Sequence, residues 1–175
     1  EVPFPASPLR RQEYQLGRLC ARAALQRLSC HSPVVGRDAL TRAPIWPSGF
    51  VGSISHASDR AIALVGRASL FEGVGVDLES SRRHVDPRIA RHVSTSWEQL
   101  AGKNLSAEQQ RWDLLRRFSV KEAIYKCCAA WFPEQTLRFH DVEVRFDAGD
   151  WQATLTRDWS SEWQKGRELR GKWGE

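Results

Sequence analysis

Hydrophobic residues recur at every second position in several short segments of the chain, which is the period of a β-strand. Segment 74–78 follows this pattern. Segment 50–55, which follows a Pro-Ser-Gly turn, and the apolar segment 61–65 are also expected to be strands, and a polar Ser-Asp-Arg turn separates them. The same alternation recurs at 141–146 and 151–156 on either side of an Asp-Ala-Gly-Asp turn. We therefore predict three strands in the first part and a β-hairpin near the end.

Other segments have apolar residues at helical spacing. We predict a first helix over 8–28, with apolar positions at 16, 19, 23 and 28. Short helices are expected over 86–92 and 96–101. A long helix should begin at Ser106, where Gln109 three residues on completes a capping box, and continue to about 131 before Pro133. The mixture predicts an α/β fold of the α+β kind.

Three ionisable residues stand among apolar residues in the long helix, in Phe118-Ser-Val-Lys-Glu-Ala-Ile-Tyr-Lys126. Glu122 and Lys126 are four residues apart, so they share one helix face. Lys121 is next to them in sequence. Such a group indicates chemistry, but an exposed Glu-Lys pair is an alternative interpretation, and such a pair stabilises a helix by only about 0.2–0.5 kcal/mol.

Two carboxylates lie two residues apart in Gly73-Val-Gly-Val-Asp-Leu-Glu79. In a strand, Asp77 and Glu79 would point to the same side. Oxygen ligands held together suit a hard divalent cation. Two ordinary acids on an edge strand are the alternative interpretation. A dinucleotide-binding loop is excluded because Leu78 takes the place of its third glycine.

A third motif is Trp46-Pro-Ser-Gly-Phe-Val-Gly-Ser-Ile-Ser-His56. Its predicted strand ends on Ser55 and His56, whose hydroxyl and imidazole can both hydrogen-bond to phosphate oxygens. Adjacent strand residues face opposite sides, so the pair is not by itself a nucleophilic dyad. Taken alone, His56 is equally explained as a structural histidine.

Composition sets limits on these hypotheses. A chain of 175 residues with 41% hydrophobic residues and eight tryptophans indicates one globular unit with a core. The net charge of +5, carried mainly by arginine, suits an anionic ligand or an acidic protein. It would also suit nucleic acid, but the basic residues are spread along the chain and not gathered in one run, so the support for that partner is weak. The four cysteines lack metal-type spacing and favour a reducing cytosol; no apolar run spans a membrane. With no methionine, the chain is expected to be a fragment or processed.

The three motifs, in this order, resemble the Sfp-type 4′-phosphopantetheinyl transferases, and most closely their enterobactin synthase component D subgroup. The resemblance covers roughly residues 10–146 and includes the segment from Arg11 to Arg22 and Arg42 before the first motif. It implies transfer of the 4′-phosphopantetheine arm of coenzyme A to a serine of an acyl or peptidyl carrier protein, with release of 3′,5′-ADP. A siderophore or other nonribosomal peptide pathway is the expected setting.

The resemblance also implies roles for individual residues. Mg²⁺, or Mn²⁺, would be held by Asp77, Glu79 and Glu122. Catalysis would involve Glu122, Lys126 beside the departing phosphate, and Glu98 as the general base towards serine. Coenzyme contacts are expected from residues that carry phosphate-binding groups, namely Arg11, Arg18, Arg42, Ser55, His56, Lys121 and Lys126.

The fold that the resemblance implies has two pseudo-twofold-related halves, about 1–72 and 73–175, each with a small sheet packed on a long helix. One catalytic monomer would bind coenzyme A between them. Relatives of this type continue past the equivalent of Lys172-Trp173 into a last strand. The alternative hypothesis is a truncated, catalytically silent module that binds coenzyme A or a carrier protein. The carrier, the oligomeric state, the preference between Mg²⁺ and Mn²⁺ and the general base stay open.

Overall fold

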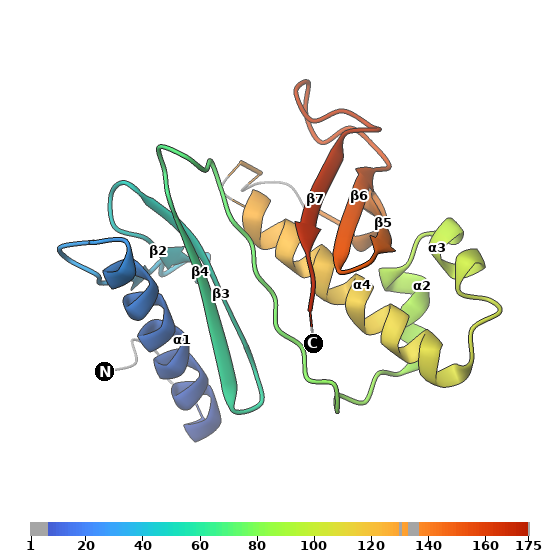
Figure 1. Ribbon diagram of the computed structural model, residues 1–175, viewed down its shortest axis with the longest axis horizontal. Coiled ribbons are helices and arrows are strands. Elements are labelled where there is room, and N and C mark those ends of the chain that lie inside the picture. Colours follow the sequence, from blue (N-terminus) through green and yellow to red (C-terminus); the bar gives the residue numbers. More distant parts are fainter. Residues whose placement is uncertain (1–6, 130, 133–136, 175) are drawn as a thin grey trace. The chain divides into compact units, whose positions relative to one another are not determined.

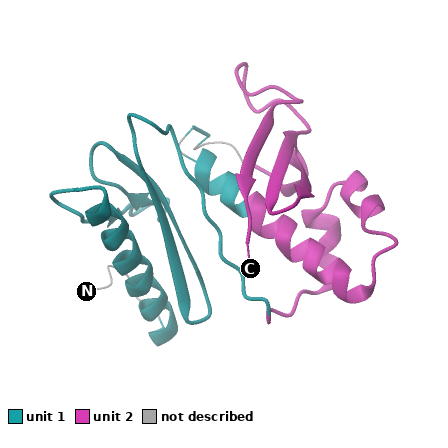
Figure 2. Ribbon diagram, in the orientation of Figure 1, with its two compact units in different colours: residues 1–81, 122–133 teal, residues 82–121, 134–175 magenta. Residues whose placement is uncertain are grey.

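The structure, a computed structural model, describes residues 7–129, 131–132 and 137–174. Helices and small antiparallel sheets alternate along the chain, which confirms the α+β class (Figure 1). The residues group into two compact units (Figure 2). Unit 1 comprises Glu1–Ser81 with Glu122–Pro133, and unit 2 comprises Arg82–Lys121 with Glu134–Glu175. The chain passes from unit 1 to unit 2 after Ser81 and returns to unit 1 inside a helix, after Lys121.

Unit 1 contains a helix packed on a hairpin. Helix α1, Pro8–Arg27, starts at Ser7, whose side chain accepts a hydrogen bond from the Arg10 amide, as an N-cap residue does. It packs against β3, Phe50–Ala57, and β4, Arg60–Arg67, which pair along their whole length. Both strands are longer than predicted. A second small hairpin is formed by two short strands, β1, Gly36–Arg37, and β2, Pro44–Ile45.

The strand predicted over 74–78 is wrong: this segment of unit 1 contains no regular secondary structure. Its backbone is bound by a side chain in place of a neighbouring strand, because Ser53 accepts from the amide of Val76 at 3.1 Å and donates to its carbonyl at 3.4 Å. Gly75 lies against the helix that carries the motif Phe118–Lys126. A Cβ atom added there would be 1.8 Å from the carbonyl oxygen of Ala123.

This close approach makes Gly75→Ala an expected destabilising substitution. The methyl group would meet backbone atoms that cannot rotate away, so we expect the free energy of unfolding to fall by about 1–3 kcal/mol. Chemical unfolding followed by tryptophan fluorescence measures the change. Gly102→Ala is the matched control, since its added Cβ meets nothing closer than 3.6 Å. Equal stability of the two variants would show that 73–79 does not pack tightly on the helix.

Unit 2 begins with three short helical segments. They are η1, Pro87–Ile89, α2, Ala90–Val93, and α3, Ser96–Ala101. The first two divide the helix predicted over 86–92, and the third has the predicted bounds. A cluster of buried apolar residues connects this region to the long helix, formed by Val85, Val93, Leu114 and Leu115.

Helix α4, Ala107–Cys128, is the long helix that carries the motif Phe118–Lys126. Ser106 and Gln109 exchange hydrogen bonds at 2.9 and 3.3 Å, which confirms the predicted capping box. The helix ends three residues before the predicted position, 131, and Pro133 lies outside the described residues. Its residues up to Lys121 belong to unit 2, and those from Glu122 onward belong to unit 1.

The rest of unit 2 is a three-stranded antiparallel sheet. A short 3₁₀ turn, η2, Phe139–Asp141, leads into the predicted hairpin, which comprises β5, Val142–Asp147, and β6, Asp150–Leu155. A further strand, β7, Glu168–Lys172, pairs with β6. We did not predict β7, because its sequence Glu-Leu-Arg-Gly-Lys is mostly polar. None of the helices in the described part of the chain is long and apolar enough to cross a membrane.

Candidate functional site

Three side chains from separate motifs meet in unit 1. Ser55 of β3 donates a hydrogen bond to Asp77 Oδ1 at 2.9 Å. Lys126 of α4 contacts the same oxygen, with Nζ at 2.5 Å, and also donates to Ser55 Oγ at 3.1 Å. The structure therefore brings together one predicted residue from each motif, and we call Ser55, Asp77 and Lys126 the acid–lysine cluster.

Asp77, the one acid of this cluster, is more buried than Lys126. Its side chain is 6% exposed, while that of Lys126 is 30% exposed. The second carboxylate oxygen, Oδ2, is buried and has no hydrogen-bond partner among the described residues. A buried carboxylate oxygen without a partner costs free energy, so it indicates a position that a ligand can fill.

Glu79 and Glu122, the other two predicted metal ligands, belong to the same unit as Asp77. Three carboxylates are a donor set that Mg²⁺ or Mn²⁺ prefers, and the open oxygen of Asp77 fits such an ion. Among the described residues, however, no three His, Cys, Asp or Glu side chains are gathered closely enough to hold a metal. A cation on Asp77 would therefore take further ligands from water and from a bound phosphate.

His56 points away from Ser55, as the alternation of a strand requires. Its Nδ1 lies 3.6 Å from Glu13 Oε1 of α1, and its side chain is 33% exposed. The sequence did not predict this contact of Glu13, because nothing in the pattern of the first helix indicates it. Sequence reasoning also missed Ser53, for which a signal existed: Ser53 and Ser55 are two apart on a strand and face the same side.

The three predicted arginines of unit 1 have different surroundings. Arg18 donates to the Gly36 carbonyl at 2.9 Å, and its guanidinium carbon lies 4.7 Å from the centre of the Tyr14 ring. Arg42 is exposed and has a positive φ of 66°. Arg11 is also exposed. Their expected contacts with the coenzyme stay predictions.

Glu98 and Lys121 form a buried ion pair in unit 2. Both side chains are 0% exposed, and Lys121 Nζ lies 2.8 Å from Glu98 Oε2. Lys121 also donates to the carbonyls of Val93, at 2.8 Å, and Phe139, at 2.9 Å. An ammonium group has three N–H donors, so these contacts use all of them.

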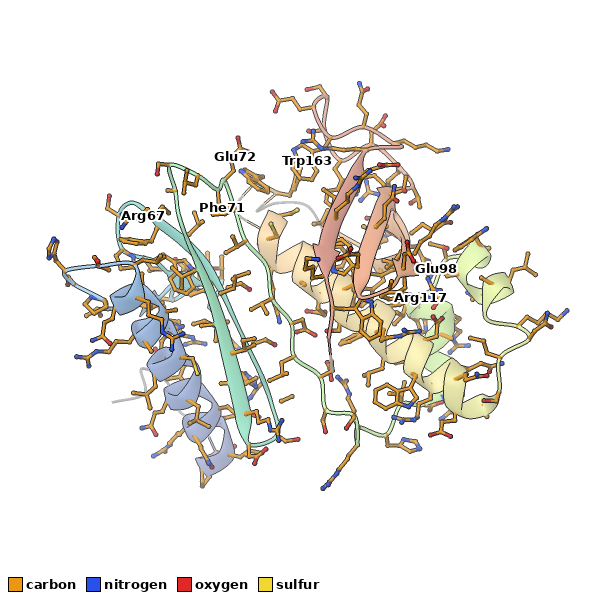
Figure 3. All side chains as sticks on the ribbon, viewed as in Figure 1. Arg67, Phe71, Glu72, Glu98, Arg117 and Trp163 are labelled. Atoms are coloured by element: carbon orange, nitrogen blue, oxygen red, sulfur yellow. The ribbon has the colours of Figure 1, made fainter. Side chains whose placement is uncertain are left out.

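Both oxygens of Glu98 accept more than one contact. Oε2 also accepts from the amide of Thr95 at 2.7 Å, which completes a capping box at the start of α3. Oε1 accepts from the amide of Val144 at 2.6 Å and lies 3.3 Å from Arg117 (Figure 3). Glu98 therefore connects α3, β5 and α4, and we call Glu98, Lys121 and Arg117 the buried charge network.

The network has electrostatic consequences. Burial lowers the pKa of Lys121 below its ordinary value of 10.5, and the negative charge of Glu98 only partly offsets this effect. The positive charge of Arg117 lowers the pKa of Lys121 further. Arg117 itself is bound by Asp113 at 2.7 Å and by the carbonyl of Val144. Glu98 would have to leave these contacts to act as a base, and Lys121 to reach a coenzyme phosphate. Both roles stay predictions.

Comparison with known proteins identifies the family. Residues 5–66 match the model of the 4′-phosphopantetheinyl transferase N-terminal domain, and residues 73–172 match that of the 4′-phosphopantetheinyl transferase superfamily. The chain belongs to the 4′-phosphopantetheinyl transferase superfamily. The resemblance that the three motifs indicated is thereby confirmed, and the acid–lysine cluster is formed by the same motifs.

Named relatives support the 4′-phosphopantetheinyl transferase assignment. The transferase Svp of Streptomyces mobaraensis is 36% identical over 157 residues, 86% of this chain and 61% of the relative. PptT of Mycobacterium tuberculosis is 34% identical over 153 residues, 84% of this chain and 64% of the relative. Enterobactin synthase component D of Salmonella austin is 32% identical over 118 residues, 67% of this chain and 47% of the relative. The chain thus spans about three-fifths of the first two.

Proposed function

We propose that the protein transfers the 4′-phosphopantetheine arm of coenzyme A to a serine hydroxyl of a carrier protein. The observation that carries this proposal is the acid–lysine cluster, in which a buried carboxylate with an open oxygen stands beside a partly exposed lysine. This pair can serve a phosphoryl transfer, because one group holds a cation and the other contacts phosphate directly. Membership of the transferase superfamily supports the same activity.

The reaction displaces one oxygen on phosphorus by another. The serine oxygen forms a bond to the phosphorus that carries the pantetheine, and the bond from that phosphorus to the bridging pyrophosphate oxygen breaks. The hydroxyl proton passes to a base, and the bridging oxygen leaves with its electron pair as part of 3′,5′-ADP. The protein must therefore accept a proton on one side of the phosphorus and stabilise negative charge on the other.

In this proposal, Asp77, Glu79 and Glu122 hold Mg²⁺, with Mn²⁺ as a substitute. When bound, the ion would neutralise the pyrophosphate charge and orient its oxygens. Lys126 stabilises the charge that develops on the departing phosphate, and its four-carbon side chain gives the ammonium group the reach to do so. Ser55 positions Asp77 through the hydrogen bond at 2.9 Å.

Coenzyme binding is assigned to the remaining predicted residues of the N-terminal segment. His56 can donate from its second ring nitrogen to a phosphate oxygen while Nδ1 faces Glu13. Arg11 and Arg42 are exposed and can form bidentate contacts with the 3′-phosphate. Glu98 is proposed as the base only if it is released from Lys121. A water molecule bound by one of the other carboxylates is the alternative path for the proton.

The carrier protein is proposed to be acidic, because a chain with a net charge of +5 attracts an acidic surface. The similarity to enterobactin synthase component D supports a siderophore or other nonribosomal peptide pathway. All four cysteines are free thiols, which supports a reducing compartment such as the cytosol. We propose that the protein acts as a monomer.

The release of 3′,5′-ADP tests the proposal. The protein is incubated with coenzyme A, Mg²⁺ and an apo peptidyl carrier protein, and the nucleotide is quantified by chromatography. We expect one 3′,5′-ADP for each carrier modified, and none when the carrier serine is replaced by alanine. Binding of coenzyme A without any release, with several apo carriers, would support the silent binding module instead.

A further inference from the structure

The ion pair between Lys126 and Asp77 occupies the place where the proposed cation would act. Lys126 Nζ is 2.5 Å from Asp77 Oδ1, and it is held there by Ser55 Oγ at 3.1 Å. The neighbouring oxygen, Oδ2, is buried and without a partner. A divalent cation on Oδ2 would therefore lie a few ångströms from the ammonium group, where like charges repel strongly.

A buried carboxylate needs a counter-charge in the absence of metal. Asp77 is 94% buried, the complement of its 6% exposure, and a lone carboxylate at such a site would be strongly destabilised. Lys126 supplies that counter-charge in this structure. Its own side chain is 30% exposed, so unlike Lys121 it can leave the carboxylate without crossing a packed core.

We propose that Lys126 is the resident counter-cation of Asp77, which moves from the carboxylate to a phosphate oxygen when a divalent cation and the coenzyme bind. The inference rests on the proposed function and adds a thermodynamic coupling to it. Without an anion, Lys126 opposes the cation because it would lose its ion pair with Asp77. With the pyrophosphate present, Lys126 gains a new partner, so the cation and the coenzyme bind cooperatively.

Mn²⁺ binding to the purified protein tests this coupling without any turnover. Free Mn²⁺ is measured by electron paramagnetic resonance, first without nucleotide and then with saturating coenzyme A. We expect Lys126→Met to bind Mn²⁺ at least tenfold more tightly than the wild type when no nucleotide is present. Lys126→Gln, a second variant that also removes the charge, should show the same gain.

The matched control is Lys172→Met. Lys172 forms an ion pair with Asp150 at the comparable distance of 2.8 Å, but both side chains are largely exposed. This control removes the same net charge, so it should leave Mn²⁺ affinity within about twofold of the wild type, the small change expected from a screened surface charge. In the wild type, coenzyme A should raise Mn²⁺ affinity by a larger factor than in Lys126→Met.

Three results would overturn the proposal. They are an unchanged or weaker Mn²⁺ affinity in both Lys126 variants, an equal gain in the Lys172 control, or an equal effect of coenzyme A in wild type and Lys126→Met. The nucleotide-free titration does not depend on transfer activity. A protein that releases no 3′,5′-ADP but shows the tenfold gain would contradict the proposed function and leave the counter-cation role supported.

Discussion

Asp77→Asn should lower the rate of phosphopantetheine transfer by about 10²–10³-fold, the loss typical of removing a group that stabilises transition-state charge. The amide has the shape of the carboxylate and can still accept the hydrogen bond from Ser55. It carries no charge for a cation or for Lys126. The effect should therefore fall on catalysis and metal binding, and not on the packing of the segment that contains Asp77.

Transfer is measured as holo-carrier formed per minute at saturating coenzyme A, with and without added Mg²⁺. Asp59→Asn is the matched control, because Asp59 is an exposed turn residue of the same unit and the substitution is chemically identical. Thermal unfolding of both variants should resemble that of the wild type. An Asp77→Asn variant that retains more than about a tenth of the wild-type rate would contradict a catalytic role for Asp77, because the loss of a catalytic carboxylate lowers the rate by much more than tenfold.

Glu98→Gln should reduce the free energy of unfolding by about 3–5 kcal/mol, the cost typical of leaving one member of a buried ion pair without its partner. The side chain keeps its shape but loses the charge that faces Lys121 at 2.8 Å and Arg117 at 3.3 Å. Its amide N–H would also point towards N–H groups that now donate hydrogen bonds to the carboxylate, and two donors cannot bond to each other. Urea unfolding followed by tryptophan fluorescence measures the loss.

The pH dependence of this loss identifies its cause. The pKa of Lys121 already lies below its ordinary value of 10.5 because of burial, and the loss of Glu98 removes the attraction that partly offsets this shift. Between the folded-state pKa and 10.5, the unfolded chain binds more protons than the folded chain, so stability rises with pH. The difference between the variant and the wild type should therefore shrink as the pH is raised through this window.

Two further variants separate charge from packing. Glu98→Gln combined with Lys121→Met removes the uncompensated ammonium group and should recover part of the lost stability. Glu168→Gln, in an exposed pair with Arg170, should cost no more than about 1 kcal/mol. If Glu98→Gln cost no more than that control, the buried charge network would not be what connects α3, α4 and β5.

The sequence predicted most of the regular elements because their local signals were strong. The capping box at Ser106 fixed the start of α4, and the Asp-Ala-Gly-Asp turn located the last hairpin. The segment 74–78 alternates but forms no strand, because alternation alone does not require one. Side-chain hydrogen bonds from Ser53 satisfy its backbone, and such long-range partners leave no mark in the local pattern.

The sequence named candidate site residues but not the contacts between them. Ser55, Asp77 and Lys126 were each expected to serve the reaction, yet their mutual hydrogen bonds depend on tertiary packing. Ser55 and Asp77 lie in one compact unit, which no local pattern indicated. The burial of Glu98 and Lys121 was also unforeseen, because polarity predicts exposure unless an ion pair is known to exist.

The most direct test of the central claim is the intact mass of an apo peptidyl carrier protein after incubation with this protein, coenzyme A and Mg²⁺. The account predicts a gain of about 340 Da, the mass of one phosphopantetheine arm joined by metal-assisted phosphoryl transfer, which is abolished by chelator and by Asp77→Asn. An unchanged carrier mass with a folded protein that binds coenzyme A, tested across carriers of nonribosomal peptide, polyketide and fatty-acid synthesis, would contradict it.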